Sequence, residues 1–167
     1  MAETYAFLGK VTGDASSVVL TMSGIDQTYQ DIEFICHVIS STSGGSSGTI
    51  TLNGDTGSFY KRSCVRDNGG TMYGKQETAA MWDINYSQAG TGGFSLVKIY
   101  IPDYATAVDH PAMYFSTGGD SDTSWEIASG GISYTPSSPA AVTSFTWTGT
   151  QTIETNSVIC AYGINYS

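Results

Sequence analysis

The sequence has little positive charge. Its 167 residues contain six Lys and Arg against 15 Asp and Glu, which gives a formal net charge of −9 and an isoelectric point near 4.3. Such a surface repels the phosphates of nucleic acids and the head groups of an anionic membrane. Neither nucleic acid nor a membrane is therefore an expected partner.

Long apolar runs and strong helix formers are also scarce. Ser95–Pro102 is among the longest apolar stretches, and it has the length of a strand rather than of a bilayer span. Leu, Lys, Glu and Arg are few, whereas Thr, Val, Ile and the aromatic residues, which suit a pleated surface, are plentiful. The length fits one domain, 1–167, that can bury a core without disulfide or metal staples. Composition therefore predicts a single all-β domain.

Cysteine is rare, with three residues in the whole chain. An odd number without metal-ligand spacing predicts neither a disulfide framework nor a zinc site. Cys36 and Cys160 lie in apolar runs, so we expect both to be small buried hydrophobic side chains. Residues 1–4 lack the basic and apolar regions of a secretory signal. We therefore expect a protein that is made and kept in a cytoplasm.

Short runs of β-branched and aromatic residues alternate with Gly, Ser, Asp and Asn clusters, a pattern typical of strands joined by turns. The predicted strands are Tyr5–Val11, Ser17–Met22, Asp31–Ser40, Gly48–Asn53, Met72–Gly74, Thr78–Asn85, Phe94–Ile101, Ala112–Ser116, Ser124–Ala128, Ser144–Thr148 and Val158–Ile164. So many strands in one domain predict an antiparallel two-sheet β-sandwich, jelly-roll-like, with about eight to ten strands. A closed barrel is the alternative architecture.

The alternation within two predicted strands assigns their faces. In Asp31–Ser40 one face is apolar, and the opposite face is only partly polar because Ile35 and Ile39 lie on it. In Phe94–Ile101 the face with Val97 forms the core, and Phe94 and Leu96 lie on the other. We expect these outward apolar residues to be covered by a partner.

Two short matches to catalytic motifs have structural explanations. Residues 55–57 (Asp-Thr-Gly) match the aspartic-protease triplet, but the preceding Asn53 and Gly54 are turn residues that tolerate positive φ. Residues 44–48 match G-x-S-x-G, but a strand follows where a nucleophile elbow needs a helix. The two histidines, His37 and His110, are interpreted as structural. No catalytic, cofactor-binding or metal-binding residue is assigned, and we expect no enzymatic activity.

Three further groups have a structural and a functional interpretation. Asp120–Glu126 gathers three carboxylates, but it lacks the EF-hand pattern, so a solvated turn is favoured over a calcium loop. Lys61, Arg62 and Arg66 are interpreted as a solvated cluster beside a turn. Some aromatic residues are candidates for stacking on sugars or for burial in the core or against a subunit. These are Tyr60, Tyr73, Trp82, Tyr86, Tyr104, Tyr114 and Trp125.

Four segments carry a family resemblance over nearly the whole chain. Gly24–Ile32 resembles an I-P-Q-T-Y-T-D-L pattern that leads into a long strand, and Leu52–Tyr60 resembles an F-N-G-D-T-G-x-N-Y turn. Ile99–Ala105 is similar to I-Y-I-P-N-Y-A, and Tyr162–Ile164 matches a closing Y-G-I. The family consists of small β-sandwich proteins on the virion surface of tailed bacteriophages, especially phages of cyanobacteria. Asp26, where the family favours Pro, is a departure.

The resemblance implies a non-enzymatic structural protein of the virion that forms a homotrimer. Related domains serve as capsid decoration or cement proteins, as head fibres and as tips of tail fibres. Because the sequence starts at Met1 without a shaft or anchor, we expect a stand-alone decoration protein that binds the major capsid protein on the capsid surface. A receptor-binding fibre tip that recognises a host surface glycan is the second hypothesis, and a free carbohydrate-binding module is the third.

Overall fold

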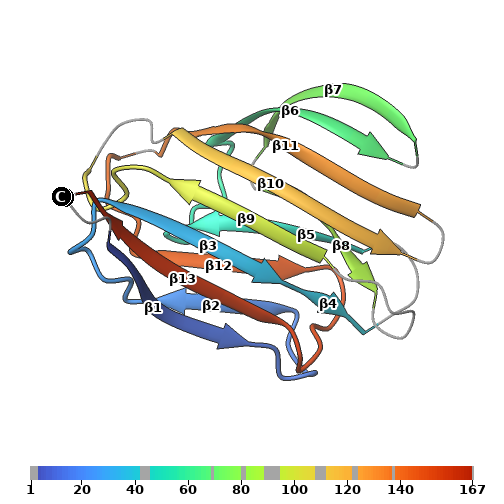
Figure 1. Ribbon diagram of the computed structural model, residues 1–167, viewed down its shortest axis with the longest axis horizontal. Helices are drawn as coiled ribbons and strands as arrows, with labels where there is room; N and C mark the ends of the chain where they lie inside the picture. Colours follow the sequence, from blue (N-terminus) through green and yellow to red (C-terminus); the bar gives the residue numbers. More distant parts are fainter. Residues whose placement is uncertain are drawn as a thin grey trace.

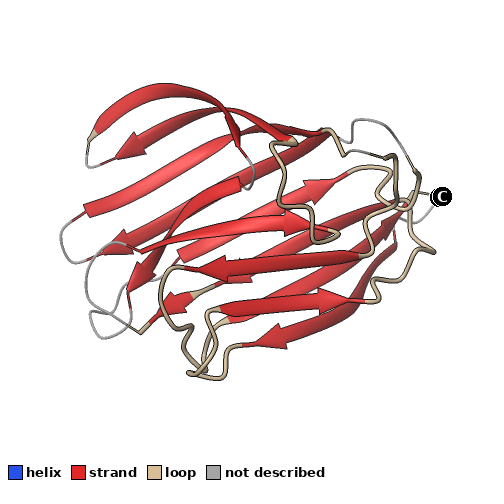
Figure 2. Ribbon diagram, turned by 180° about the vertical axis from the view of Figure 1, so that it is seen from behind, coloured by secondary structure: helices blue, strands red, loops and turns tan. Residues whose placement is uncertain are grey.

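The computed structural model describes residues 4–41, 46–68, 70–79, 82–88, 95–107, 112–121, 124–136 and 138–166. Within these residues the regular secondary structure is entirely β, in thirteen strands (Figures 1 and 2). The strands are β1 (Thr4–Thr12), β2 (Val19–Ser23), β3 (Asp31–His37), β4 (Ile39–Ser40), β5 (Ser46–Leu52), β6 (Tyr60–Asn68), β7 (Thr71–Ala79), β8 (Trp82–Gln88), β9 (Ser95–Ile101), β10 (Ala112–Ser121), β11 (Ser124–Tyr134), β12 (Ser144–Gly149) and β13 (Val158–Asn165). No helix in this part of the chain is long and apolar enough to cross a membrane.

The strands form two stacked sheets. The large sheet has the order β1-β13-β3-β9-β10-β11-β6-β7, and the small sheet has the order β2-β12-β5-β8-β4. All pairings are antiparallel except the two-residue contact of β4 with β8. Figures 1 and 2 show the sheets as two layers, with β1 at one end of the large sheet and the bowed strand β7 at the other.

The strand order confirms the predicted jelly-roll-like sandwich. Without the two-residue strand β4 and the hairpins β6–β7 and β10–β11, the sheets read β1-β13-β3-β9 and β2-β12-β5-β8. That is the order of an eight-stranded jelly roll, in which two Greek keys place chain neighbours in opposite sheets. The two hairpins are insertions that lengthen the large sheet at its β9 side.

Most of the predicted strands are present, with four differences. The predicted strand Asp31–Ser40 is wrong as a single element, since it divides at Val38 into β3 of the large sheet and β4 of the small sheet. Strand β6 was not predicted, because its Lys and Arg residues suggested a turn. The predicted strand Thr78–Asn85 is wrong as a single element, since Thr78 belongs to β7 and Asn85 to β8 of the other sheet. Strands β10 and β11 run several residues beyond the predicted ends. Phe94 lies outside the described residues.

The core lies between the two sheets and follows the predicted alternation. In β3 the side chains of Ile32, Phe34 and Cys36 are fully buried, and in β9 those of Val97 and Ile99 are buried as well. The small sheet contributes Phe145 and Trp147, both fully buried. Phe34 and Phe145 stack with ring centroids 4.3 Å apart and so join the two sheets directly.

The Asn53-Gly54 turn is confirmed. Both residues have positive φ, 54° and 73°, and the N–H of Asp55 donates to the carbonyl of Leu52 at 2.9 Å. The turn joins β5 and β6, which belong to different sheets, so it is not a hairpin between paired strands. The Asp55 carboxylate accepts a hydrogen bond from the Tyr134 hydroxyl. The triplet at 55–57 therefore serves the fold.

Tyr60 begins β6 in the core and stacks on Tyr134 with ring centroids 4.9 Å apart. Its hydroxyl accepts a hydrogen bond from the N–H of Leu52 at 2.9 Å. Burial raises the pKa of Tyr60 to about 12, against the weaker opposing effect of that hydrogen bond. The side chain is therefore neutral at physiological pH and supports the turn through its oxygen.

Three of the four segments that carry the family resemblance, Gly24–Ile32, Ile99–Ala105 and Tyr162–Ile164, meet one another. The Tyr29 ring covers Gly163, where a Cβ atom would lie 2.3 Å from the ring, so the position excludes any larger residue. The Tyr104 hydroxyl donates to the Asp26 carbonyl, and the N–H of Asp103 donates to the Asp31 carboxylate at 2.9 Å. These contacts fix the ends of β3, β9 and β13 relative to one another.

Replacement of Phe34 by Ala should lower the free energy of unfolding by about 3–5 kcal/mol, because it opens a cavity between the sheets. Denaturant unfolding monitored by tryptophan fluorescence measures this loss. Phe7→Ala is the matched control, since Phe7 is 57% exposed, and it should change stability by less than about 1 kcal/mol. Equal effects of the two substitutions would contradict the assigned core.

Candidate functional site

The outward face of the large sheet carries a row of aromatic side chains, which we call the aromatic platform. It consists of Tyr5, Phe7, Tyr100, Tyr114, Tyr162 and Tyr166. Tyr5, Phe7, Tyr114 and Tyr166 are each at least half exposed. Large exposed aromatic side chains that cluster on one face mark a contact surface rather than a core.

Antiparallel register brings these side chains together from four strands. Phe7 of β1 pairs with Tyr162 of β13, and Tyr100 of β9 pairs with Tyr114 of β10. Tyr5 stacks on Tyr162 at a centroid distance of 4.8 Å, and Phe7 meets the same ring edge-on at 5.7 Å. Paired residues on neighbouring strands share one face of a sheet, so the platform follows from the alternation of each strand.

A buried carboxylate anchors each half of the platform. Glu33 on β3 is 6% exposed. It accepts a hydrogen bond from the Tyr5 hydroxyl at 2.6 Å and forms an ion pair with Lys98 at 2.7 Å. Partial burial and the hydrogen bond to Glu33 raise the pKa of Tyr5. Tyr5 is thus held in place by the stack of its ring on Tyr162 and by the hydrogen bond of its hydroxyl to Glu33.

Asp31 anchors the other half of the aromatic platform. It is 5% exposed, and it accepts hydrogen bonds from the Tyr100 hydroxyl and from the N–H of Asp103. Tyr100 and Tyr166 share a further hydrogen bond of 3.0 Å. Burial raises the pKa of Tyr100, and its hydrogen bonds with Asp31 and Tyr166 raise it further. Tyr100 and the N–H of Asp103 thus occupy the Asp31 carboxylate, as Tyr5 and Lys98 occupy that of Glu33.

A second surface on the same face is apolar. Val65, Met72, Leu96 and Ile127 are between 47% and 71% exposed, and we call this group the apolar patch. Leu96 and Ile127 both pair with Gly118, which has no side chain between them. Asp67 lies between Ile127 and Met72 in the same cross-strand row.

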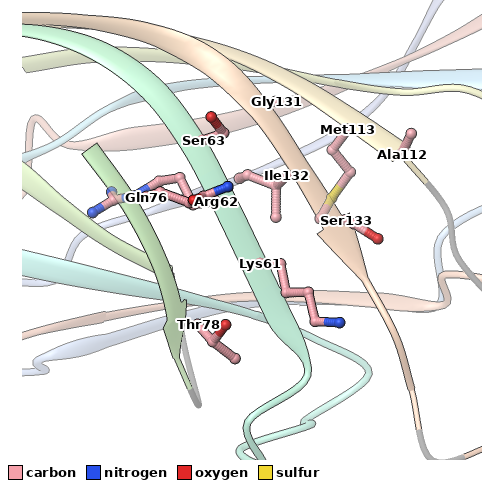
Figure 3. Close-up of a pocket in the computed structure, with 10 residues that line it drawn as sticks. All are labelled: Lys61, Arg62, Ser63, Gln76, Thr78, Ala112, Met113, Gly131, Ile132 and Ser133. Carbon is pink, nitrogen blue, oxygen red and sulfur yellow. The ribbon is translucent and has the colours of Figure 1, made fainter. Parts of the chain in front are cut away.

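A hollow of about 610 Å³ lies on this face where β7, β6, β11 and β10 run side by side (Figure 3). Ten residues line it: Lys61, Arg62, Ser63, Gln76, Thr78, Ala112, Met113, Gly131, Ile132 and Ser133. Arg62 has a partner within the protein, whereas the side chains of Lys61, Ser63, Gln76, Thr78 and Ser133 bond to no other described residue. The size falls within the range of small-molecule sites.

The structure decides between the alternatives for three of the aromatic candidates and corrects the interpretation of the basic cluster. Tyr60 and Tyr104 are buried in the core and are not available to a ligand, whereas Tyr114 is exposed. Lys61, Arg62 and Arg66 lie within β6 rather than beside a turn, and Arg62 is 8% exposed, so a solvated cluster is wrong for it. The side chains of Tyr73, Trp82, Tyr86 and Trp125 lie outside the described residues.

The expectations for outward apolar residues are partly confirmed. Leu96 is exposed, while Ile35 and Ile39 are half-buried. Sequence reasoning missed Tyr5 and Phe7, although their alternation with Ala6 and Leu8 in the first predicted strand was visible. Val65 and Met72 were missed because the hairpin that carries them was not predicted as such.

The cysteines and histidines do not form a site within the described residues. All three cysteines are free; Cys36 and Cys64 are buried, but Cys160 is half-buried on the outward face, so its expected burial is only partly correct. Burial raises the pKa of the Cys36 thiol. His37 is half-buried, and His110 lies outside the described residues, as do the side chains of Asp120–Glu126. No group of three metal ligands occurs in the part of the chain that is described.

Comparisons with known proteins leave the function open. No protein-family model and no curated protein matches the chain. A solved structure described as "Structure of infectious bursal disease virus Gx strain" aligns with 98% of this chain and 39% of that chain, at 17% sequence identity and a TM-score of 0.21. A likeness this low supports no inference about fold or function.

Replacement of Glu33 by Ala should lower the free energy of unfolding by about 1–3 kcal/mol, because the Tyr5 hydroxyl and Lys98 lose their common partner. The near-ultraviolet circular dichroism of the tyrosines should weaken at the same time. Glu33→Gln, which keeps an acceptor for Tyr5, should retain more of both. A Glu33→Ala variant with unchanged stability and spectrum would show that the platform does not depend on this anchor.

Proposed function

We propose that the protein is a structural component of a bacteriophage virion, a capsid decoration or cement protein that binds the outer surface of the major capsid lattice. The family resemblance of the four sequence segments supports this proposal, and the jelly-roll sandwich is compatible with it. The observation that carries it is the aromatic platform, which is exposed, extends over four strands and is held in place by Asp31 and Glu33.

The platform has the physical properties of a protein contact surface. Tyrosine and phenylalanine bury large areas with few rotatable bonds, so ordering them on binding costs little entropy. Here the cost is lower still, because the Tyr5 and Tyr100 hydroxyls are already hydrogen-bonded to the protein. A chain with a net charge of −9 gains little from charge attraction to an acidic partner and needs such an apolar contact.

In the same proposal the protein is a homotrimer whose subunits meet through the apolar patch. Closed cyclic symmetry joins one surface of each subunit to a different surface of its neighbour and leaves no open contact. Capsids present three-fold positions that such a trimer fits. Repulsion between subunits of charge −9 requires an uncharged centre at the contact, which Leu96, Ile127 and Val65 provide, while Asp67 lies on the Met72 side of Ile127.

A receptor-binding tip of a head or tail fibre is the second candidate function. The hollow between β7 and β10 favours it, because the hydroxyl, amide and ammonium groups in its lining suit a host surface glycan. A free carbohydrate-binding module is a third possibility that the same hollow would serve. In the leading proposal the protein is not an enzyme, it is assembled in the host cytoplasm, and it resides on the capsid surface.

Purified protein should co-sediment with undecorated capsids of its phage at micromolar concentration. Phe7→Ala and Tyr162→Ala should each raise the concentration needed for half-saturation about tenfold or more, because both truncate the platform. Val18→Ala is the control, since Val18 is 40% exposed but precedes β2 of the small sheet. Absence of co-sedimentation would remove the capsid role, and equal affinities of all variants would exclude the platform as the contact.

Light scattering coupled to size-exclusion chromatography should give three times the 17.6 kDa mass of the chain. Added salt should strengthen the trimer, because it screens the repulsion between acidic subunits. Ile127→Asp should dissociate it, whereas Val18→Asp should leave it intact. A monomer mass at every salt concentration, with single copies on the virion, would contradict a trimer.

A further inference from the structure

The hollow on the large sheet is built from two neighbouring cross-strand rows. In the first row Tyr114, Gly131, Ser63 and Gln76 follow one another across β10, β11, β6 and β7. In the second, Ala112, Ser133, Lys61 and Thr78 do the same. Register alone therefore places eight side-chain positions from four strands side by side on the outward face.

Gly131 gives the hollow its depth. A Cβ atom at this position would meet only the Met113 carbonyl oxygen, at 3.7 Å, which is an ordinary contact. The fold therefore does not require glycine here, in contrast to Gly130, whose Cβ atom would lie 2.2 Å from the Ser63 carbonyl oxygen. The space above Gly131 is free for another molecule.

The polar groups around this space suit a polyhydroxylated ligand. Ser63, Thr78 and Ser133 carry hydroxyls that both donate and accept, Gln76 offers an amide, and Lys61 offers an ammonium donor. Ser63, Gln76, Thr78 and Lys61 are exposed, and Ser133 is half-buried. Each sugar hydroxyl also donates and accepts, so this set can satisfy several hydroxyls of one saccharide without a metal ion.

A tyrosine neighbours the hollow in the same cross-strand row, although it does not itself line it. Tyr114 pairs directly with Gly131 and is 56% exposed, and its hydroxyl is 2.6 Å from that of Ser129. The hydrogen bond fixes the hydroxyl end of the side chain. The apolar face of a sugar ring packs well against an aromatic side chain whose position is set in advance.

We propose that this hollow binds an uncharged oligosaccharide, with Tyr114 stacking on one sugar ring and Lys61, Ser63 and Gln76 binding its hydroxyls. The described lining holds no carboxylate, but the chain as a whole carries a net charge of −9, which disfavours a polyanionic glycan. The inference goes beyond the capsid role and does not depend on it, because Lys61, Ser63 and Gln76 lie outside the aromatic platform, and only Tyr114 belongs to both proposed contact surfaces.

A microarray of oligosaccharides from bacterial surfaces identifies the probe, and isothermal titration calorimetry with the strongest neutral hit measures its affinity. Gly131→Thr should weaken binding about tenfold or more, because the added side chain fills the hollow. Gly118→Thr is the matched control. Gly118 lies on the same face with open space around a Cβ atom, but it does not line the hollow, so binding should be unchanged.

Two further pairs of variants separate the roles of ring and charge. Tyr114→Ala should lose binding, whereas Tyr114→Phe should keep most of it, because the ring is what stacks. Lys61→Met should weaken binding several-fold, and Lys10→Met, which removes the same charge on β1, should not. Circular dichroism and denaturant unfolding confirm that each variant is folded.

The absence of binding to every saccharide on the array would overturn the inference. Equal effects of Gly131→Thr and Gly118→Thr would also overturn it, since the saccharide would then bind elsewhere. Hits confined to acidic glycans, or tighter binding of a polyglutamate peptide that Lys61→Met abolishes, would replace the neutral saccharide by an anionic ligand. Loss of capsid binding with intact saccharide binding would remove only the proposed capsid role.

Discussion

The face-to-face contact of the two sheets, centred on the Phe34–Phe145 stack, is the constraint from which the rest of the structure follows. Once one face of β3, β9 and β13 is committed to this core, the alternation of a strand commits every other residue to the opposite face. Glu33, Lys98 and Tyr162 are outward for that reason. The aromatic platform is thus a consequence of the register that the core imposes.

How well each strand can be predicted from the sequence depends on how consistently apolar its inward residues are. Strands β3 and β9 are readable because their inward residues are fully apolar over several alternations. Strand β6 is not, because Arg62 and Arg66 lie at its inward positions, and charged residues there imitate a solvated turn. Tyr60 and Tyr104 show a further limit. Tyrosine suits both a core and a surface, so only the register decides which it occupies.

The four segments that carry the family resemblance contribute mainly to the fold. Tyr29 packs on Gly163, the Tyr104 hydroxyl donates a hydrogen bond to the Asp26 carbonyl, and the Asp55 carboxylate accepts one from the Tyr134 hydroxyl. Close backbone approaches and buried hydrogen bonds of this kind tolerate few substitutions. Of the platform residues, Tyr5, Phe7, Tyr114 and Tyr166 lie outside these segments, whereas Tyr100 and Tyr162 lie within them. A resemblance carried by such positions indicates a shared architecture more strongly than a shared partner.

The two inserted hairpins explain why one sheet face can hold three different surfaces. The jelly-roll strands β1, β13, β3 and β9 carry most of the platform, and the hairpins β10–β11 and β6–β7 extend the same face beyond it. The added strands carry glycines at Gly74, Gly118 and Gly131, where open space leaves room for a partner. The polar hollow lies at the Ala112 end of β10, and the apolar patch lies near its Gly118. Val65 of the patch and Ser63 of the hollow are alternate residues of β6 on the same face, so the two surfaces adjoin, and a subunit contact at the patch would border the hollow.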